Sequence, residues 1–156
     1  MDLLLDALLA WLGENADFDV AGVVHPEVVV MSREALTDRY YSGARHLTPE
    51  DGVDERLNAL YAAGDGPAGT IYILAPALAP EAEAFDDPAQ NPVWREYLLH
   101  ELIHHLQWQT GEVEGWACLR EGERAAYLIG GRYLRDTGTP DPLPNRPFWA
   151  HFYARC

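Results

Sequence analysis

The sequence predicts an α+β fold in which a small mixed or antiparallel sheet packs against helices, as a single domain over residues 1–156. Three observations support this prediction. The first half of the chain alternates short helical and extended patterns, whereas the second half contains two long helical patterns. No internal repeat, low-complexity tract or long linker divides the chain. Hydrophobic residues make up 48% and charged residues 23%, which is typical of a globular protein.

The N-terminal part of the chain supplies short elements. The segment MDLLLDALLAWLGEN predicts an amphipathic helix that Asp2 can cap. The β-branched run at residues 28–31 follows a proline and predicts a buried strand, after which Ser32 is placed to cap a short helix. Residues 57–62 and 70–74 flank a Gly-Asp-Gly-Pro turn and predict a β-hairpin, although residues 57–62 equally fit the last turns of a helix.

The second half is predominantly helical. Residues 93–109 are apolar on nearly every side and follow an Asn-Pro start signal, which predicts a buried helix. A second helix is expected from Glu114 or Trp116 to Leu134. The tail at residues 139–156 is rich in proline and aromatic residues, so we expect an irregular segment that packs on the domain and ends in a short helix.

Composition restricts the partners and the location. Eleven basic and twenty-five acidic residues give a net charge of -14, which disfavours nucleic acids and anionic membranes. The N-terminal apolar stretch is interrupted by acidic residues, unlike a signal peptide, and no run is long enough to span a bilayer. We therefore expect a cytoplasmic protein. In that compartment Cys118 and Cys156, which lie in no paired spacing, are expected to be free thiols.

The buried helix carries the sequence His100-Glu101-Leu102-Ile103-His104, an H-E-x-x-H pattern. Four residues advance a helix by about 400°, so both imidazoles lie on one face and can bind one metal ion. Glu101 is turned by about 100° from His100 and can contact a water without binding the ion itself. The pattern predicts zinc bound by His100 and His104, with Glu101 as general base. His105 points away and is expected to be structural.

Catalytic zinc usually has three protein ligands and one open position. Glu112 and Glu114 lie too close to the end of the first helix to fold back easily, so Glu121 and Glu123 remain as candidates for the third ligand. Spacing alone does not choose between them.

Glu123 stands nineteen residues after His104, and an H-E-x-x-H pattern followed by a glutamate at this spacing resembles the gluzincin metallopeptidases. The short chain looks most like the minimal gluzincins, or minigluzincins. The resemblance implies Glu123 as the third ligand and residues 70–74 as an edge strand that aligns an extended peptide. It departs from the family at Tyr127, where an acidic residue usually orients a histidine. Tyr127 is expected to take that role or to stabilise the oxyanion, and His151 in the tail is a further candidate for oxyanion stabilisation.

The sequence thus predicts a zinc-dependent peptidase that acts on a peptide or protein, and it does not indicate an oligomeric state. Two alternatives remain open. In the first alternative, the zinc site is structural or latent and the domain is a binding module, in which the tail lies across the metal and supplies the fourth ligand. In the second alternative, the protein is a regulatory peptidase that cleaves one folded partner. Such enzymes have a similar histidine helix before a Glu-x-x-Ala helix, and Glu123 to Ala126 fits that pattern.

Overall fold

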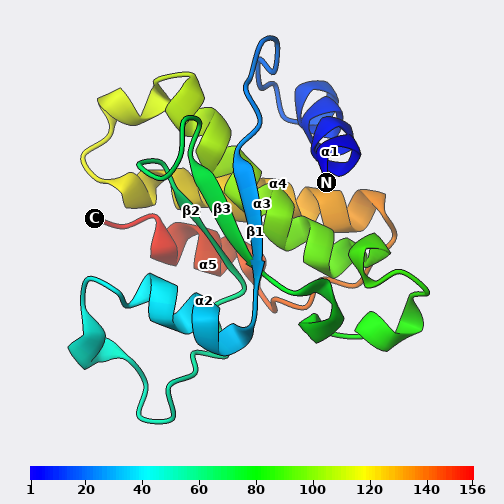
Figure 1. Cartoon of the computed structure of the whole chain (residues 1–156). Helices are drawn as coiled ribbons and strands as arrows, with labels where there is room; N and C mark the ends of the chain where they lie inside the picture. Colours follow the sequence, from blue (N-terminus) through cyan, green and yellow to red (C-terminus); the bar gives the residue numbers. More distant parts are fainter.

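The computed structural model describes all 156 residues, which form helices around one three-stranded sheet (Figure 1). The strands are β1 (Glu27–Met31), β2 (Ala59–Ala62) and β3 (Thr70–Leu74). Their order is β1-β3-β2, with β1 parallel and β2 antiparallel to β3. The predicted α+β class with a mixed sheet is confirmed, and the segment at residues 57–62 contributes a strand of the predicted hairpin rather than a helix end.

Strand β3 is the central strand of the sheet. Tyr72 pairs with Val29 of β1 on one side and with Leu60 of β2 on the other. The expectation that residues 70–74 form a substrate-aligning edge strand is therefore wrong, because both of their hydrogen-bonding edges are already occupied. Strand β1, which was expected to be buried, lies at one edge of the sheet and leaves Val30 46% exposed. The other edge is β2.

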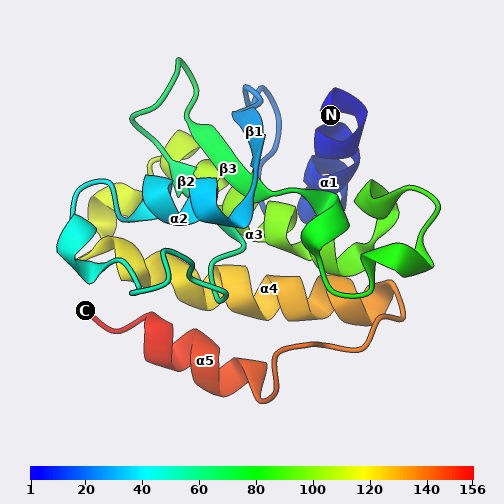
Figure 2. The same ribbon diagram turned by 60° about the horizontal axis from the view of Figure 1, so that its bottom comes forward.

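The five helices are, in chain order, α1 (Asp2–Asn15), α2 (Arg33–Tyr40), α3 (Pro92–Gln109), α4 (Glu123–Asp136) and α5 (Arg146–Tyr153). Three of them, α3, α4 and α5, are stacked in layers on one side of the sheet. Figure 2 shows α3 between the sheet and α4, and α4 between α3 and α5. The final short helix expected in the tail is α5, which runs along α4.

The core forms where α1, α3 and the sheet meet. Four leucines of α1 at helical spacing are buried in it, at positions 5, 8, 9 and 12. Helix α3 is buried on most of its surface, as its sequence predicts, and Trp94 fixes it to the sheet by donating a hydrogen bond of 2.8 Å from Nε1 to the Leu74 carbonyl oxygen. Asn91 caps α3 by accepting from the Val93 amide at 2.9 Å. No helix is both long enough and apolar enough to cross a membrane.

The segment between α3 and α4 differs from the prediction. In place of one helix from residue 114 or 116, the chain makes two short 3-10 turns, Glu112–Gly115 and Leu119–Gly122, and α4 begins only at Glu123. Glycines at positions 115 and 122 favour this interruption, because glycine is a poor helix former. Helix α4 therefore begins at Glu123, one of the two candidates for the third ligand.

The two cysteines form a disulfide, so the expectation of free thiols is wrong. Helix α5 runs back along α4, so the C-terminus reaches the segment before α4 (Figure 2). The Cα atoms of Cys118 and Cys156 lie 5.9 Å apart. The sequence contains no spacing signal for this pair because 38 positions separate its members. Disulfides persist mainly in oxidising environments, so the bond does not support the expected cytoplasmic location.

Candidate metal centre

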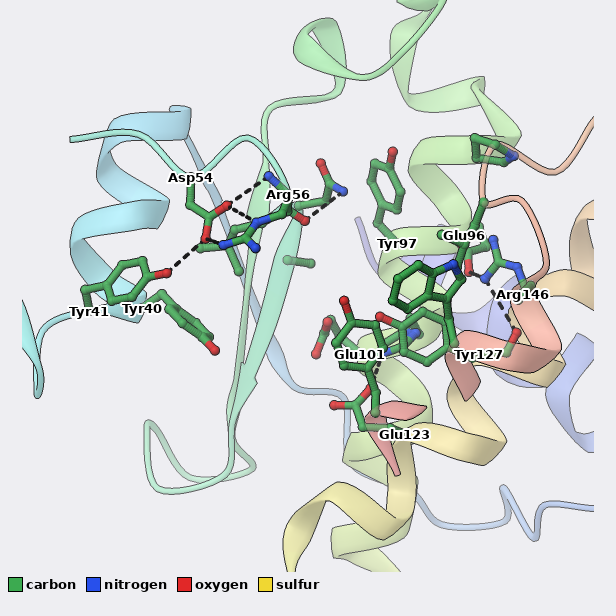
Figure 3. A pocket seen from close by; sticks show the side chains of 18 residues that line it. Tyr40, Tyr41, Asp54, Arg56, Glu96, Tyr97, Glu101, Glu123, Tyr127 and Arg146 are labelled. Atoms are coloured by element: carbon green, nitrogen blue, oxygen red, sulfur yellow. Dashed lines mark hydrogen bonds and ion pairs between the residues drawn. The ribbon is translucent and has the colours of Figure 1, made fainter. Parts of the chain in front are cut away.

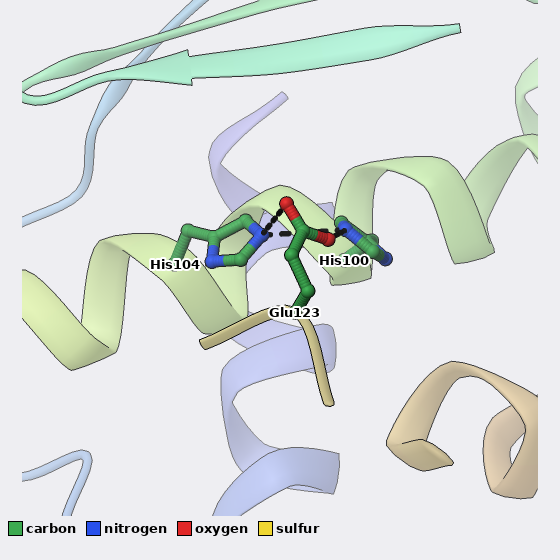
Figure 4. A group of neighbouring side chains, drawn as sticks. All are labelled: His100, His104 and Glu123. Atoms are coloured by element: carbon green, nitrogen blue, oxygen red, sulfur yellow. Dashed lines mark hydrogen bonds and ion pairs between the residues drawn. The ribbon is translucent and has the colours of Figure 1, made fainter. Parts of the chain in front are cut away.

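The two histidines of α3 lie one turn apart and turn their rings to the same side. Their ring centroids are 5.0 Å apart, and the Nε2 atoms of His100 and His104 are separated by 3.3 Å (Figure 4). The four-residue spacing produces this geometry because α3 is a regular helix over its full length. Both side chains are largely buried, with 15% and 16% of their surface exposed.

Glu123, the first residue of α4, completes the group. Its Oε2 lies 3.2 Å from His100 Nε2, and its Oε1 lies 3.6 Å from His104 Nε2 (Figure 4). One donor atom from each of the three residues falls within 4.8 Å of the others, so the group can hold a metal ion. The position of Glu121 is different: its Oε1 accepts from the Ala117 amide at 2.8 Å, and the structure does not bring it to the histidines.

Burial and charge act against each other in this group when no ion is present. Burial lowers the pKa of His104, but the hydrogen bond and negative charge of Glu123 outweigh it and raise that pKa to about 9. Burial likewise raises the pKa of Glu123, and the two imidazoles reverse this to a net lowering. A bound cation would supply the positive charge that the ionised Glu123 requires.

Glu101 lies beside this group without belonging to it. It lines the adjacent cavity, and only 8% of the residue is exposed. Burial raises its pKa, although the histidines and the backbone of Tyr61 oppose the shift. A raised pKa improves a carboxylate as a proton acceptor near neutral pH. Glu101 thus lines the same cavity as His100 and Glu123 but is not a member of the group that could hold a metal ion.

A cavity of about 790 Å³ opens beside the three residues (Figure 3). Its floor is α3, one wall is the segment that follows α2 and leads into β2, and the opposite wall is α4 with α5. Aromatic side chains from these walls surround it at positions 40, 41, 97, 127, 149 and 153. The cavity is therefore large enough for several side chains of an extended peptide, and it reaches His100, Glu101 and Glu123.

Tyr127 lies next to the histidines, as the sequence suggested. Its ring packs edge-on against His100, with centroids 4.9 Å apart and an interplanar angle of 83°. The contact is made through the ring, and no hydrogen bond joins the Tyr127 hydroxyl to His100. The phenol therefore does not orient this histidine in the way an acidic residue would. Burial raises the pKa of Tyr127, so its hydroxyl stays protonated and able to donate.

His151 is not brought to the site. It is exposed on α5, and its Nδ1 donates to the Pro147 carbonyl oxygen at 3.0 Å. The face of α5 that meets α4 and the cavity carries Arg146, Trp149 and Tyr153, spaced at helical intervals, and position 151 falls outside that stripe. Tyr153, rather than His151, is the residue of this helix turn that lines the cavity, and it stacks on Tyr127 with ring centroids 5.5 Å apart. The helical spacing of 146, 149 and 153 is the signal that could have identified it.

Helix α5 is fixed by a buried ion-pair network at its first residue. Arg146 donates from Nη1 to Glu96 of α3 at 2.8 Å and from Nε to Asp141 at 2.7 Å. Side-chain exposure is 7% for Arg146 and 5% for Glu96. The guanidinium crosses α4 over Gly130 and Gly131, where any β-carbon would collide with Glu96 or Arg146. The contact of Arg146 with Glu96 thus holds α5, which forms one wall of the cavity, in a fixed position relative to α3.

We expect Arg146→Met to destabilise the protein by about 3–5 kcal/mol, because it leaves the Glu96 carboxylate buried without a cation. The double variant Glu96→Leu/Arg146→Met should recover part of this loss, since the buried Glu96 carboxylate is then absent as well and only the more exposed Asp141 is left without its partner. Urea unfolding of the wild type, the single variants Arg146→Met and Glu96→Leu, and the double variant measures both effects. Arg124→Met, at an exposed position of α4 with no ion pair, is the matched control; an equal loss in this variant would contradict the role of the network.

The fold and the site together define a class: an α+β protein with a candidate metal centre formed by two helices at the edge of a cavity. Residues 1–144 match the model of a family described as "Domain of unknown function (DUF6647)", and the chain belongs to this family. Neither the curated proteins nor the solved structures contain a match to the chain.

Proposed function

We propose that the protein is a zinc-dependent metallopeptidase of the gluzincin type. The observation that supports zinc is the spacing of the donor atoms: the Nε2 atoms of His100 and His104 lie 3.3 Å apart, and the two carboxylate oxygens of Glu123 lie 3.2 Å from the first nitrogen and 3.6 Å from the second. Ligands about 2.0–2.1 Å from zinc at tetrahedral corners lie about 3.3–3.4 Å apart. The residues therefore fit the ion, and three protein ligands leave one corner open for water, as in catalytic zinc sites.

A bound zinc ion would polarise the scissile carbonyl group and lower the pKa of a water molecule at the open position. Glu101 is placed to accept the proton of that water and then to donate it to the leaving amine. Its burial supports both steps, because a carboxyl group with a raised pKa is a better base and exchanges its proton more readily near neutral pH.

Strand β2 is the element proposed to align the substrate, in place of residues 70–74. It is an edge strand, and the Asn58 carbonyl oxygen accepts from the Leu74 amide at 2.9 Å. Because hydrogen bonding alternates along an antiparallel pair, the backbone groups of the next residue, Ala59, point away from β3. Ala59 also lines the cavity beside Glu101. An extended peptide could add to this edge with its backbone near the general base.

Tyr127 is the proposed donor to the oxyanion. Its hydroxyl has no hydrogen-bond partner within the protein, it lines the cavity next to His100, and it stays protonated because burial raises its pKa. Tyr153, stacked on it, restricts the ring to this position.

The position of the tail supports the catalytic alternative over a closed structural site. A structural zinc site has four protein ligands. The group that can hold a metal contains three residues and none from positions 139–156. The tail lies along α4 and contributes a wall of the cavity, so the fourth position would remain accessible to water and substrate. A single folded partner as the substrate has no specific observation in its favour.

The test is metal analysis of the purified wild-type protein, combined with cleavage of a mixed peptide library followed by mass spectrometry. We expect near-stoichiometric zinc and cleavage that a chelator abolishes and added zinc restores. Bound zinc without chelator-sensitive cleavage would favour the non-catalytic binding module. A protein that takes up no zinc when supplied with it would refute the metal centre.

A further inference from the structure

The side chain of Gln107 joins the two helices of the metal centre. It lies on α3 one turn after His104 and is 1% exposed. Its Oε1 lies 2.9 Å from His104 Nδ1, and its Nε2 donates to the Gly122 carbonyl oxygen at 3.2 Å. Gly122 directly precedes Glu123. One buried amide therefore contacts a ligand side chain at one end and the backbone beside another ligand at the other.

The second contact fixes the orientation of the amide. A carbonyl oxygen only accepts, so the NH₂ group must face Gly122, and this leaves Oε1 facing His104. His104 must then carry a proton on Nδ1 and donate it to Gln107. As a result, its Nε2, which faces His100 and Glu123, is the nitrogen available to a metal ion.

The close approach depends on the glycine. A β-carbon at position 122 would lie 2.6 Å from Gln107 Oε1 and 2.7 Å from the Trp116 ring, and both distances are below van der Waals contact. Only glycine allows the start of α4 to lie this close to α3. The sequence and the packing thus agree in bringing the Gly122 carbonyl to Gln107.

We infer that Gln107 is a positioning residue for the metal centre, which selects the protonated nitrogen of His104 and sets the position of Glu123 through Gly122. This inference rests on the proposed metal centre. An amide is required for both tasks, because a carboxylate would accept from His104 but could not donate to Gly122. Replacing Gln107 by Glu and by Leu therefore separates the two tasks.

The first measurement follows the Nδ1 proton of His104 by NMR, in metal-free and in zinc-loaded protein. In the wild type and in Gln107→Glu, we expect a downfield Nδ1–H signal that is protected from exchange with water. In Gln107→Leu the acceptor is missing, so the protected signal should disappear. This measurement requires neither peptidase activity nor a bound metal. Persistence of the signal in Gln107→Leu would overturn the inference.

The second measurement is zinc affinity by competition with a chromophoric chelator. Loss of an outer partner of a histidine ligand typically costs about 10–100-fold in metal affinity, which is the loss we expect for Gln107→Leu. Gln107→Glu should bind zinc more tightly than Gln107→Leu, because it keeps the acceptor for His104. Gln109→Leu, an exposed glutamine on the same helix, is the matched control and should bind zinc as the wild type does.

The outcomes separate the inference from the proposed function. If the wild type binds zinc and a folded Gln107→Leu binds it within about twofold, the positioning role is wrong and the metal centre stands. If the wild type binds no zinc, the metal centre itself is wrong. Urea unfolding curves establish that each variant is folded. If Gln107→Leu does not fold, the zinc affinity of Gln107→Glu still tests the contact to Gly122. An affinity below that of the wild type and of Gln109→Leu supports this contact, and an equal affinity overturns it.

Discussion

Glu101→Gln should remove peptide hydrolysis and leave metal binding intact. The amide keeps the size of the side chain but cannot accept the proton of the attacking water. General acid–base catalysis typically contributes about 10²–10⁴-fold, and we expect the cleavage rate to fall by this factor. Zinc should stay bound, because Glu101 is not a member of the group formed by the two histidines and Glu123. Peptide cleavage followed by mass spectrometry, together with zinc analysis, measures both.

The same variant should be at least as stable as the wild type. The pKa of Glu101 is raised in the folded metal-free protein, so folding disfavours its ionised form, and the cost appears as pH rises above the ordinary pKa of 4.5. A neutral glutamine removes this cost. Urea unfolding at neutral pH should therefore give an equal or higher midpoint, which excludes unfolding as the cause of lost activity. A functional carboxylate maintained at the expense of stability is common at active sites.

Glu112→Gln, at an exposed position after α3, is the matched control for this pair of measurements and should leave cleavage and stability unchanged. Two results would contradict the role of Glu101. One is a cleavage rate in Glu101→Gln above about a tenth of the wild-type rate, because this loss would be smaller than the roughly 100-fold minimum expected when a general base is removed. The other is loss of zinc in Glu101→Gln, which would make Glu101 part of the metal group.

The features that the sequence predicted are those that depend on one helix. The positions of His100 and His104 follow from helical periodicity alone, once Asn91 and Pro92 start α3 and its apolar surface buries it. The direction of Glu101 follows from the same geometry. The hairpin of β2 and β3 was equally local, because the glycine-rich turn between the strands carries the signal.

The features that it did not predict depend on pairing between distant segments. Whether residues 70–74 form an edge or a central strand depends on where β1 pairs, about forty residues earlier in the chain, and no local pattern states this. The disulfide requires α5 to run back along α4, a path set by the buried contact of Arg146 with Glu96. Arg146 itself lies among prolines in the sequence, and nothing local marks it as buried. Gln107 likewise gains its role only when Gly122 arrives beside it.

Glu123→Ala should weaken zinc binding more than any other single change outside the histidines. Apparent binding free energies of about 10–16 kcal/mol for four-ligand zinc sites correspond to about 2.5–4 kcal/mol for each ligand. The loss of one ligand is therefore expected to weaken zinc binding roughly 100- to 1,000-fold. The variant also removes the only carboxylate in contact with both imidazoles, which lie 3.2 and 3.6 Å from it. Competition with a chelator of known affinity measures the change.

Glu121→Ala is the decisive comparison, because spacing alone made Glu121 an equal candidate for the third ligand. In the structure its carboxylate accepts from the Ala117 amide and takes no part in the metal group, so we expect zinc affinity within a factor of about three of the wild type. A larger loss of zinc in Glu121→Ala than in Glu123→Ala would reverse the assignment. The two glutamates lie two residues apart at the end of a 3-10 turn and the start of α4, so only the point at which the helix begins directs Glu123 to the histidines. The interruption of the second helix before residue 123 is thus the local feature on which the position of Glu123 beside the histidines depends.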